Sequence, residues 1–204
     1  MKHPVKFIYF DIGGVMIRWK GMITKLAQIH NKKAEEVEGA FAKYDELSCR
    51  GLLTTLELKD KMFKDLNIKA DKDFNFLEFS TQQFSPILET HRFAKKISRH
   101  LPIGLLTNIH HGFYDRALHA GQIPKLRYDA IIQSCLLGII KPEKEIYLHA
   151  QKQAKVPHNN ILFIDDYQKN IEAADALGWQ TVLFETENPE KSLKEINDLL
   201  GVRP

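Results

Sequence analysis

Cysteine is scarce in this sequence. The 204 residues contain only two, Cys49 and Cys135, which lie in separate segments and follow no metal-binding spacing. This scarcity excludes a disulfide framework and a zinc motif built from paired cysteines. We expect both side chains to be free thiols in a reducing compartment.

Long apolar runs are also missing, since none approaches the roughly 20 residues that a membrane-spanning helix needs. Asp11 interrupts the apolar stretch near the N-terminus before it reaches the length of a signal peptide. The formal net charge is only +3, and the basic residues form no stripe interleaved with aromatic side chains. We therefore expect a cytoplasmic protein with neither a membrane nor a nucleic-acid partner.

The composition is that of an ordinary globular protein, with 44% hydrophobic and 27% charged residues. A chain of this length forms one domain, or one domain with an insertion, and buries a substantial core. Short apolar segments at 7–10, 103–107, 128–133, 161–164 and 181–184 alternate with predicted helices. Such alternation predicts an α/β fold with a doubly wound, Rossmann-like parallel sheet.

The predicted helices between these strands cover residues 86–98, 112–120, 143–154, 170–177 and 190–200. Ser85 and Pro86 are interpreted as the N-cap and first-turn proline of the first of these helices. Residues 18–84 break the alternation: apolar positions 37, 40, 41 and 44 form a helical stripe, and Thr54 with Glu57 resembles a capping box. We predict a core domain of residues 1–17 and 85–204, with an all-helical insertion at 18–84.

Polar residues follow the predicted strands at several carboxyl ends, where parallel sheets bind their ligands. They are Asp11, Thr107 with Asn108, and Asp165 with Asp166, joined by Lys141 and Pro142 in a loop. Each group alone is typical of a turn, a helix cap or a solvated loop. Together they are chemically complementary, which indicates an active site.

This set of residues fits phosphate chemistry. A carboxylate such as Asp11 can attack phosphorus and form an acyl phosphate. Asp11, Asp166 and a backbone carbonyl near Gly13 offer the hard oxygen ligands that Mg²⁺ prefers. Lys141 would neutralise negative charge, and the Thr107 hydroxyl with nearby backbone N–H groups would bind phosphate oxygens.

The sequence resembles the haloacid dehalogenase superfamily of aspartyl-phosphate hydrolases over nearly its whole length. Four motifs match in order: FDIGGV at 10–15, LLTN at 105–108, Lys141-Pro142, and FIDDYQKNIEAADALGW at 163–179. The helical insertion resembles the cap domain that follows the first strand in many members. The sequence is most similar to phosphatases of the alpha-D-glucose-1-phosphate type, with the N-terminal phosphatase domain of epoxide hydrolases as a near relative.

The resemblance implies a Mg²⁺-dependent phosphatase that hydrolyses a small phosphorylated metabolite, of the sugar-phosphate class, through an aspartyl-phosphate. It also implies a role for each matching residue. These are Asp11 as nucleophile and metal ligand, Gly13 as carbonyl ligand, Thr107 and Asn108 as substrate binders, Lys141 as charge stabiliser, Asp166 as metal ligand, and Asp165 and Asn170 as residues steadying the metal site.

Gly13 departs from the pattern, because most phosphatases of this superfamily have there a second Asp that protonates the leaving group. Three interpretations remain open: a phosphatase whose substrate needs little acid help, a metal-independent dehalogenase, or a catalytically weak protein that binds phosphates or partners. A dehalogenase has no use for the paired acids Asp165 and Asp166, which favours Mg²⁺ and phosphate. The oligomeric state is left open.

Substrate selection is expected to depend on the insertion and on the loop after the first motif. Arg18, Trp19 and Arg50 are candidates for contacting a polar substrate, with surface charge and cap packing as the alternative. His110 and His111 follow the second motif, and one of them could supply the missing acid. A solvated helix start is the alternative for both.

Overall fold

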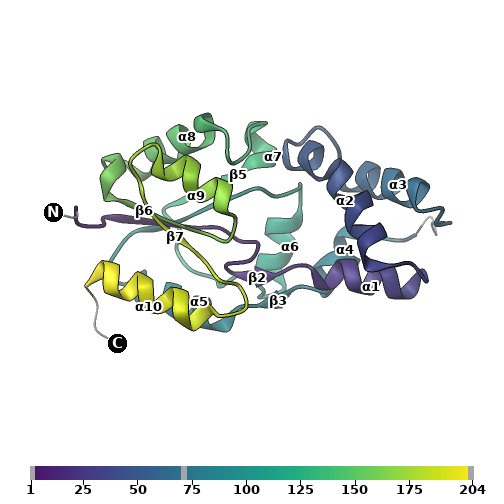
Figure 1. The fold of residues 1–204 in the computed structure, drawn as a ribbon, viewed down its shortest axis with the longest axis horizontal. Coiled ribbons are helices and arrows are strands. Elements are labelled where there is room, and N and C mark those ends of the chain that lie inside the picture. The colour runs from purple at the N-terminus through teal and green to yellow at the C-terminus, as the bar shows by residue number, and fades with distance from the viewer. Residues whose placement is uncertain (1–2, 70–72, 202–204) are drawn as a thin grey trace.

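The computed structural model describes residues 3–69 and 73–201 of the chain. Its main sheet has five parallel strands in the order β5-β4-β1-β6-β7 (Figure 1). The strands are β1 (Phe7–Phe10), β4 (Ile103–Thr107), β5 (Ala130–Gln133), β6 (Ile161–Asp165) and β7 (Gln180–Leu183). The predicted fold class is thus confirmed.

Helices cover both faces of this sheet (Figure 1). One face is covered by α5 (Leu88–Ile97), α6 (Phe113–His119) and α10 (Pro189–Leu200). The other is covered by α8 (Lys144–Ala154) and α9 (Gln168–Asp175), accompanied by the short α7 (Ser134–Leu137) and a 3₁₀ turn, η1 (His158–Asn160). The helices predicted for these regions are all present, with ends shifted by a few residues.

The position of β1 at the centre of the sheet explains why its sequence is uninterruptedly apolar. Ile8 and Phe10 belong to the core on one face, and Phe7 and Tyr9 belong to the core on the other. A parallel strand between two helical layers has no solvent-facing side, so each of its positions is apolar. This burial fixes β1 and directs the residue after Phe10 to the carboxyl edge of the sheet.

The described part of the insertion forms four helices, which lie beyond the carboxyl edge of the sheet (Figure 1). They are α1 (Gly21–Ile29), α2 (Ala34–Cys49), α3 (Thr55–Asp65) and α4 (Phe76–Gln82). A short antiparallel pair, β2 (Ile17–Arg18) and β3 (Ser85–Pro86), brackets them. Buried apolar side chains of these helices form a third hydrophobic cluster, which Phe113 of α6 also joins. The division at residues 18–84 stays a prediction. The proposed ranges also include residues 1–2, 70–72 and 202–204, which lie outside the described residues.

The predicted capping box at α3 is present. The Thr54 hydroxyl accepts from the Glu57 N–H at 3.2 Å, and the Thr54 N–H donates to the Glu57 carboxylate at 2.8 Å. The interpretation of Ser85 and Pro86 as a helix start is wrong, because both residues form β3 and α5 begins at Leu88. Pairing with the distant strand β2, in which Ile17 lies opposite Pro86 and Arg18 opposite Ser85, overrides the local preference of a Ser-Pro sequence for a helix start.

Two further features bear on the expectations from the sequence: the state of the two cysteines and the length and polarity of the helices. Cys49 and Cys135 are free and buried. Within residues 3–69 and 73–201, the structure contains no helix long and apolar enough to cross a membrane.

A buried hydrogen bond ties β1 to α8. The Tyr9 hydroxyl on β1 donates to the Ala150 carbonyl on α8 at 2.7 Å. Removing it by Tyr9→Phe leaves a buried carbonyl with one partner fewer, so we expect the free energy of unfolding to fall by about 1–2 kcal/mol. Urea denaturation followed by circular dichroism measures this fall, with Tyr167→Phe, a change in an exposed side chain, as the control. Equal stability of both variants would contradict the assignment.

Candidate active site

Three neighbouring strands bring the predicted polar residues together at one edge of the sheet. Asp11 directly follows β1, Thr107 ends β4 and Asp165 ends β6, and β1 lies between the other two strands. Lys141 enters from the loop between α7 and α8. The carboxyl ends of parallel strands point to the same edge, so the strand order alone makes these residues neighbours.

Lys141 is the central group of the site. Its ammonium lies 3.0 Å from the Asp11 carboxylate and 2.6 Å from the Asp165 carboxylate, and it donates to the Leu106 carbonyl at 3.0 Å. The side chain is only 1% exposed. Burial alone would lower the pKa of this lysine, but the two carboxylates outweigh burial and raise its pKa. Lys141 is therefore a permanent cation between two acids.

Asp11 is held in place by its own backbone as well as by Lys141. The Ile12 N–H donates to Asp11 Oδ1 at 2.7 Å, the same oxygen that lies closest to the Lys141 ammonium. Burial raises the pKa of Asp11 to about 7, and the carboxylates of Asp165 and Asp166 add to this rise against the opposing effect of Lys141. The site thus contains more negative charge than Lys141 alone neutralises.

Asp165 has a different environment from Asp11. It is completely buried, and its Oδ2 accepts from Lys141. Its Oδ1 accepts from the Tyr167 N–H at 2.8 Å and from the Asn170 amide at 3.0 Å. Both oxygens of Asp165 have protein donors, so its role here is to orient and neutralise Lys141.

Asp166 is exposed and lies against the backbone at Gly14. Gly14 has φ +72°, and a Cβ at this position would lie 1.9 Å from Asp166 Oδ2. Glycine is required here both for the backbone conformation and for the approach of the carboxylate. Sequence reasoning missed Gly14, although the doubled glycine after Asp11 was a signal for it.

The arrangement fits a hard divalent cation. Oxygens of Asp11, Asp165 and Asp166 lie within 4.8 Å of one another, and one lysine neutralises only one of these three charges. Although Asp166 is exposed as a whole residue, loss of hydration at its carboxylate raises its pKa to about 6, and the nearby Asp165 adds to this rise. Since Asp165 is occupied, Asp11 and Asp166 are the carboxylates that can bind Mg²⁺.

Gly13 makes a parallel bridge with Ile17 beside the site. A Cβ at Gly13 would lie 3.4 Å from the Trp19 ring, so the indole occupies the space next to this position. That distance is an ordinary van der Waals contact. The carbonyl of Gly13 stays a predicted ligand.

Thr107 and Asn108 have separate environments although they are adjacent. Thr107 is buried and lines the cavity beside Asp11. The Asn108 amide donates to the Lys141 carbonyl at 2.9 Å, and its oxygen accepts from the Lys141 N–H at 2.8 Å. Asn108 thus positions the Lys141 backbone, and direct substrate binding by Asn108 stays a prediction.

A cavity of about 410 Å³ joins the sheet edge to the insertion. Its lining includes Asp11, Thr107 and Asp166 from the core, with Trp19 and Phe41 from the insertion. The described residues that line it do not include Arg18, Arg50 or His111. The size suits a small metabolite.

The two arginines have protein partners elsewhere. Arg18 donates to the Thr186 carbonyl at 2.8 Å, and Arg50 forms ion pairs with Glu46 and Glu143. These contacts favour the interpretation of both arginines as structural charges. Of the predicted substrate contacts, Trp19 faces the cavity.

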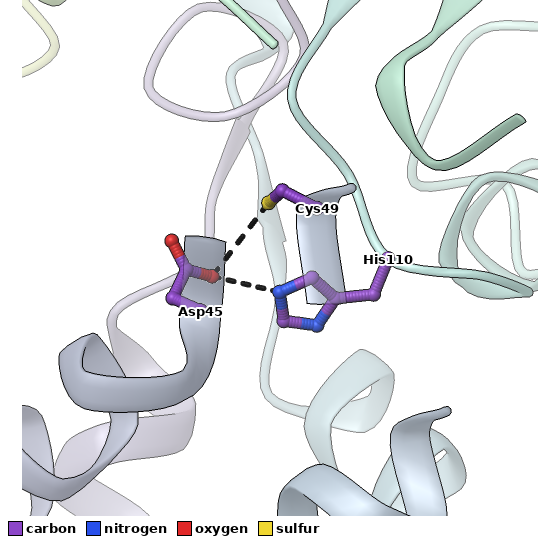
Figure 2. Close-up of side chains that lie close together, drawn as sticks. All are labelled: Asp45, Cys49 and His110. Carbon is purple, nitrogen blue, oxygen red and sulfur yellow. Dashed lines mark hydrogen bonds and ion pairs between the residues drawn. The ribbon is translucent and has the colours of Figure 1, made fainter. Parts of the chain in front are cut away.

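His110 also lines the cavity, but it is buried and paired, unlike the solvated helix start that we considered. Its Nε2 lies 2.7 Å from Asp45 Oδ1, and the same oxygen accepts from Cys49 Sγ at 3.8 Å (Figure 2). Sequence reasoning missed Asp45 and Cys49. Their spacing of four residues within a helix was a signal, but the partner His110 is 61 residues further along the chain.

The family model described as haloacid dehalogenase-like hydrolase matches residues 5–178. Acyl-CoA dehydrogenase family member 10 of Mus musculus is 25% identical over 95% of this chain. Bifunctional epoxide hydrolase 2 of Mus musculus is 33% identical over 37% of it. The matches cover only 19% and 13% of these two relatives, respectively.

Solved structures share the fold. A haloacid dehalogenase family enzyme of Bacteroides thetaiotaomicron, bt-2542, superposes with a TM-score of 0.74 at 18% identity, covering 90% of this chain and 95% of that one. L-2-haloacid dehalogenase of Xanthobacter autotrophicus superposes with a TM-score of 0.69 at 13% identity, covering 98% and 85%. At these identities the likeness concerns the fold alone.

Because Asp11 and Asp165 share the Lys141 ammonium, we expect that removing this charge strongly lowers the stability of the protein. Lys141→Met leaves the buried Asp165 carboxylate without its cation, so we expect the free energy of unfolding to fall by about 3–5 kcal/mol. Adding Asp165→Asn should restore part of this loss, because the uncompensated charge is then removed. Chemical denaturation measures both variants, with Lys191→Met, which breaks an exposed ion pair with Glu185, as the control. Unchanged stability in Lys141→Met would contradict the central role of the lysine.

Proposed function

The chain belongs to the haloacid dehalogenase-like hydrolase family, and we propose that it is a Mg²⁺-dependent phosphatase acting on a small phosphorylated metabolite. The observation that supports this most is the excess of carboxylates over cations: Asp11, Asp165 and Asp166 surround the single ammonium of Lys141. A divalent cation would balance this excess of negative charge and could hold a phosphate beside Asp11. The enzyme bt-2542 was crystallised with magnesium and inorganic phosphate, which agrees with this proposal.

Asp11 is the proposed nucleophile. Its carboxylate attacks phosphorus, the bond between phosphorus and the ester oxygen breaks, and the leaving alkoxide takes up a proton. Water then attacks phosphorus of the aspartyl-phosphate and loses a proton to solvent. The bond between phosphorus and the Asp11 oxygen breaks, which releases inorganic phosphate and restores the Asp11 carboxylate. Asp11 is fixed for this attack by the Ile12 N–H and by Lys141.

Charge is the main obstacle to this attack, because a carboxylate approaches a phosphate dianion. Lys141 reduces the repulsion, with Asp165 holding its ammonium beside Asp11. Asp11, Asp166 and the Gly13 carbonyl are the proposed metal ligands, and Mg²⁺ when bound supplies further positive charge at the phosphate oxygens. Thr107 is proposed to donate its hydroxyl to a phosphate oxygen, since it lines the cavity with Asp11.

The absence of an acid at Gly13 bears on the substrate. A sugar phosphorylated at its anomeric carbon has a comparatively good leaving group, so it requires less protonation in the transition state. We therefore propose the sugar-phosphate class, in a cavity whose size admits a small metabolite. Trp19 beside Gly13 offers an apolar ring on which the sugar can rest.

Two alternatives differ in what they need from the carboxylates. Haloacid dehalogenation displaces halide from carbon without a metal, so the cavity carboxylate Asp166 would have no function in it. A catalytically weak phosphate-binding protein is the second candidate function, and the lack of an acid at Gly13 favours it. That candidate predicts phosphate binding without turnover.

The nucleophile is tested by Asp11→Asn. This near-isosteric change removes the attacking charge, so we expect turnover of phosphate esters to fall by at least about a thousandfold. Initial rates with a generic aryl phosphate and Mg²⁺ measure the loss. Asp175→Asn, an exposed acid on α9, is the matched control and should keep the full rate. Persistent activity in Asp11→Asn would overturn the assignment.

The metal and the substrate class are tested together with a panel of phosphorylated metabolites, assayed with Mg²⁺ and with a chelator. We expect sugar phosphates to be hydrolysed only with Mg²⁺, because the carboxylate excess otherwise repels the substrate. Asp166→Asn should raise the Mg²⁺ concentration needed for half-maximal rate. Chelator-resistant release of halide from 2-haloacids would indicate dehalogenation. Phosphate binding without turnover of any ester would indicate the binding protein.

A further inference from the structure

A second group of metal-binding side chains lies where the insertion meets the core. Asp45 and Cys49 come from α2, and His110 comes from the loop after β4 (Figure 2). Asp45 Oδ1 lies 2.7 Å from His110 Nε2 and 3.8 Å from Cys49 Sγ. One donor atom of each residue falls within 4.8 Å of the others. The cluster thus offers oxygen, sulfur and nitrogen to a single point.

Local structure places these donors independently of any cation. Asp45 and Cys49 are four residues apart on α2, so they lie on the same face of the helix. The buried Ser134 hydroxyl donates to the Cys49 carbonyl at 2.6 Å and accepts from the Ile109 N–H at 3.0 Å. One serine therefore ties the end of α2 to the residue before His110. Such supporting bonds hold ligands in position in known metal sites.

Packing also fixes the imidazole. The ring of His110 lies between Phe41 and Phe113, with centroid distances of 5.7 and 5.5 Å. His110 and Cys49 are buried, while Asp45 is partly exposed. All three donors line the cavity that also contains Asp11. A cation bound by these three side chains would have its remaining position open to the cavity.

The donor set differs in kind from that of the catalytic carboxylates. Thiolate and imidazole suit Zn²⁺ and related transition metals, whereas Mg²⁺ takes hard oxygen ligands and full hydration. Three protein ligands with one open position are typical of zinc sites that exchange a ligand. We propose that Asp45, Cys49 and His110 bind a transition-metal cation of the Zn²⁺ class, with water from the cavity in the fourth position.

Binding at this site is linked to proton release. Burial raises the pKa of the Cys49 thiol well above its usual range, and the Asp45 carboxylate beside it raises that pKa further. Without a cation the thiol stays protonated and donates to Asp45. A divalent cation takes the place of the thiol proton, which leaves to solvent, so affinity rises with pH.

Occupancy would join two parts of the protein. Asp45 and Cys49 belong to the insertion, whereas His110 is two residues after Asn108 in the core. The bound cation would therefore fix α2 over the cavity and limit any movement of the insertion relative to Asp11. This consequence does not depend on the chemistry performed at Asp11.

Cobalt(II) tests the proposal directly, because a thiolate ligand gives a charge-transfer absorption band that oxygen ligands do not give. The 204-residue chain is titrated with Co²⁺ in excess Mg²⁺, which keeps the carboxylate site from contributing. We expect one equivalent of Co²⁺ to produce the band, and Zn²⁺ to abolish it. Absence of the band in the unmodified chain at alkaline pH would overturn the proposal.

Matched variants locate the ligands. Cys49→Ser should lose the band, while Cys135→Ser, the other buried free cysteine, should keep it. His110→Ala should weaken Co²⁺ binding by at least about a hundredfold, while His111→Ala should bind as the unmodified chain does. Survival of the band in Cys49→Ser, or its loss in Cys135→Ser, would contradict the site. Circular dichroism confirms folding of each variant, and Asp45→Asn replaces any variant that fails to fold.

The supporting serine gives an independent measurement. Ser134→Ala removes the bonds to Cys49 and Ile109 without removing a ligand, so we expect Co²⁺ affinity to fall about 10–100-fold with the band retained. Ser192→Ala, another buried serine, whose hydroxyl accepts from the Glu185 N–H, is the control. Unchanged affinity in Ser134→Ala would show that the cluster is not held for a metal.

Discussion

The interaction on which this structure depends is the burial of one ammonium, that of Lys141, between the carboxylates of Asp11 and Asp165. Burying charge is unfavourable unless each charge has close partners, and here every partner comes from a different segment of the chain. The buried charges are therefore compensated only when three segments come together correctly: the end of β1, the end of β6 and the loop before α8. Asn108 completes this network by binding both backbone polar groups of Lys141.

The charges within this network do not balance. Its acids outnumber its cation. Burial raises the pKa values of Asp11 and Asp166, and the neighbouring carboxylates add to the rise. A fold that only required stability would gain by replacing one of these acids with a neutral residue. The excess negative charge enables the site to bind a cation. The residues that determine the stability of this sheet edge are thus also the residues proposed to carry out its chemistry.

Much of the fold could be predicted because its strands are buried on both faces and read as continuous apolar segments. The core residues of the site could be predicted for a related reason: Asp11, Thr107 and Asp165 stand at strand ends, whose location follows from topology. Ser85 failed as a helix cap because its conformation depends on pairing with Arg18, a contact that local sequence does not encode. The cluster of Asp45, Cys49 and His110 was missed for the same reason, since it forms only when α2 meets the loop after β4.

The short pair of β2 and β3 has an effect out of proportion to its length. It brings the two ends of the insertion side by side, with Ile17 opposite Pro86 and Arg18 opposite Ser85. Because the two ends of the insertion are held together, the insertion forms a closed loop. The conformational entropy lost on closing such a loop grows only slowly with its length. The pair thus fixes where the chain leaves the sheet and where it returns, so the length of the helical segment between these two points has little bearing on the closure of that loop.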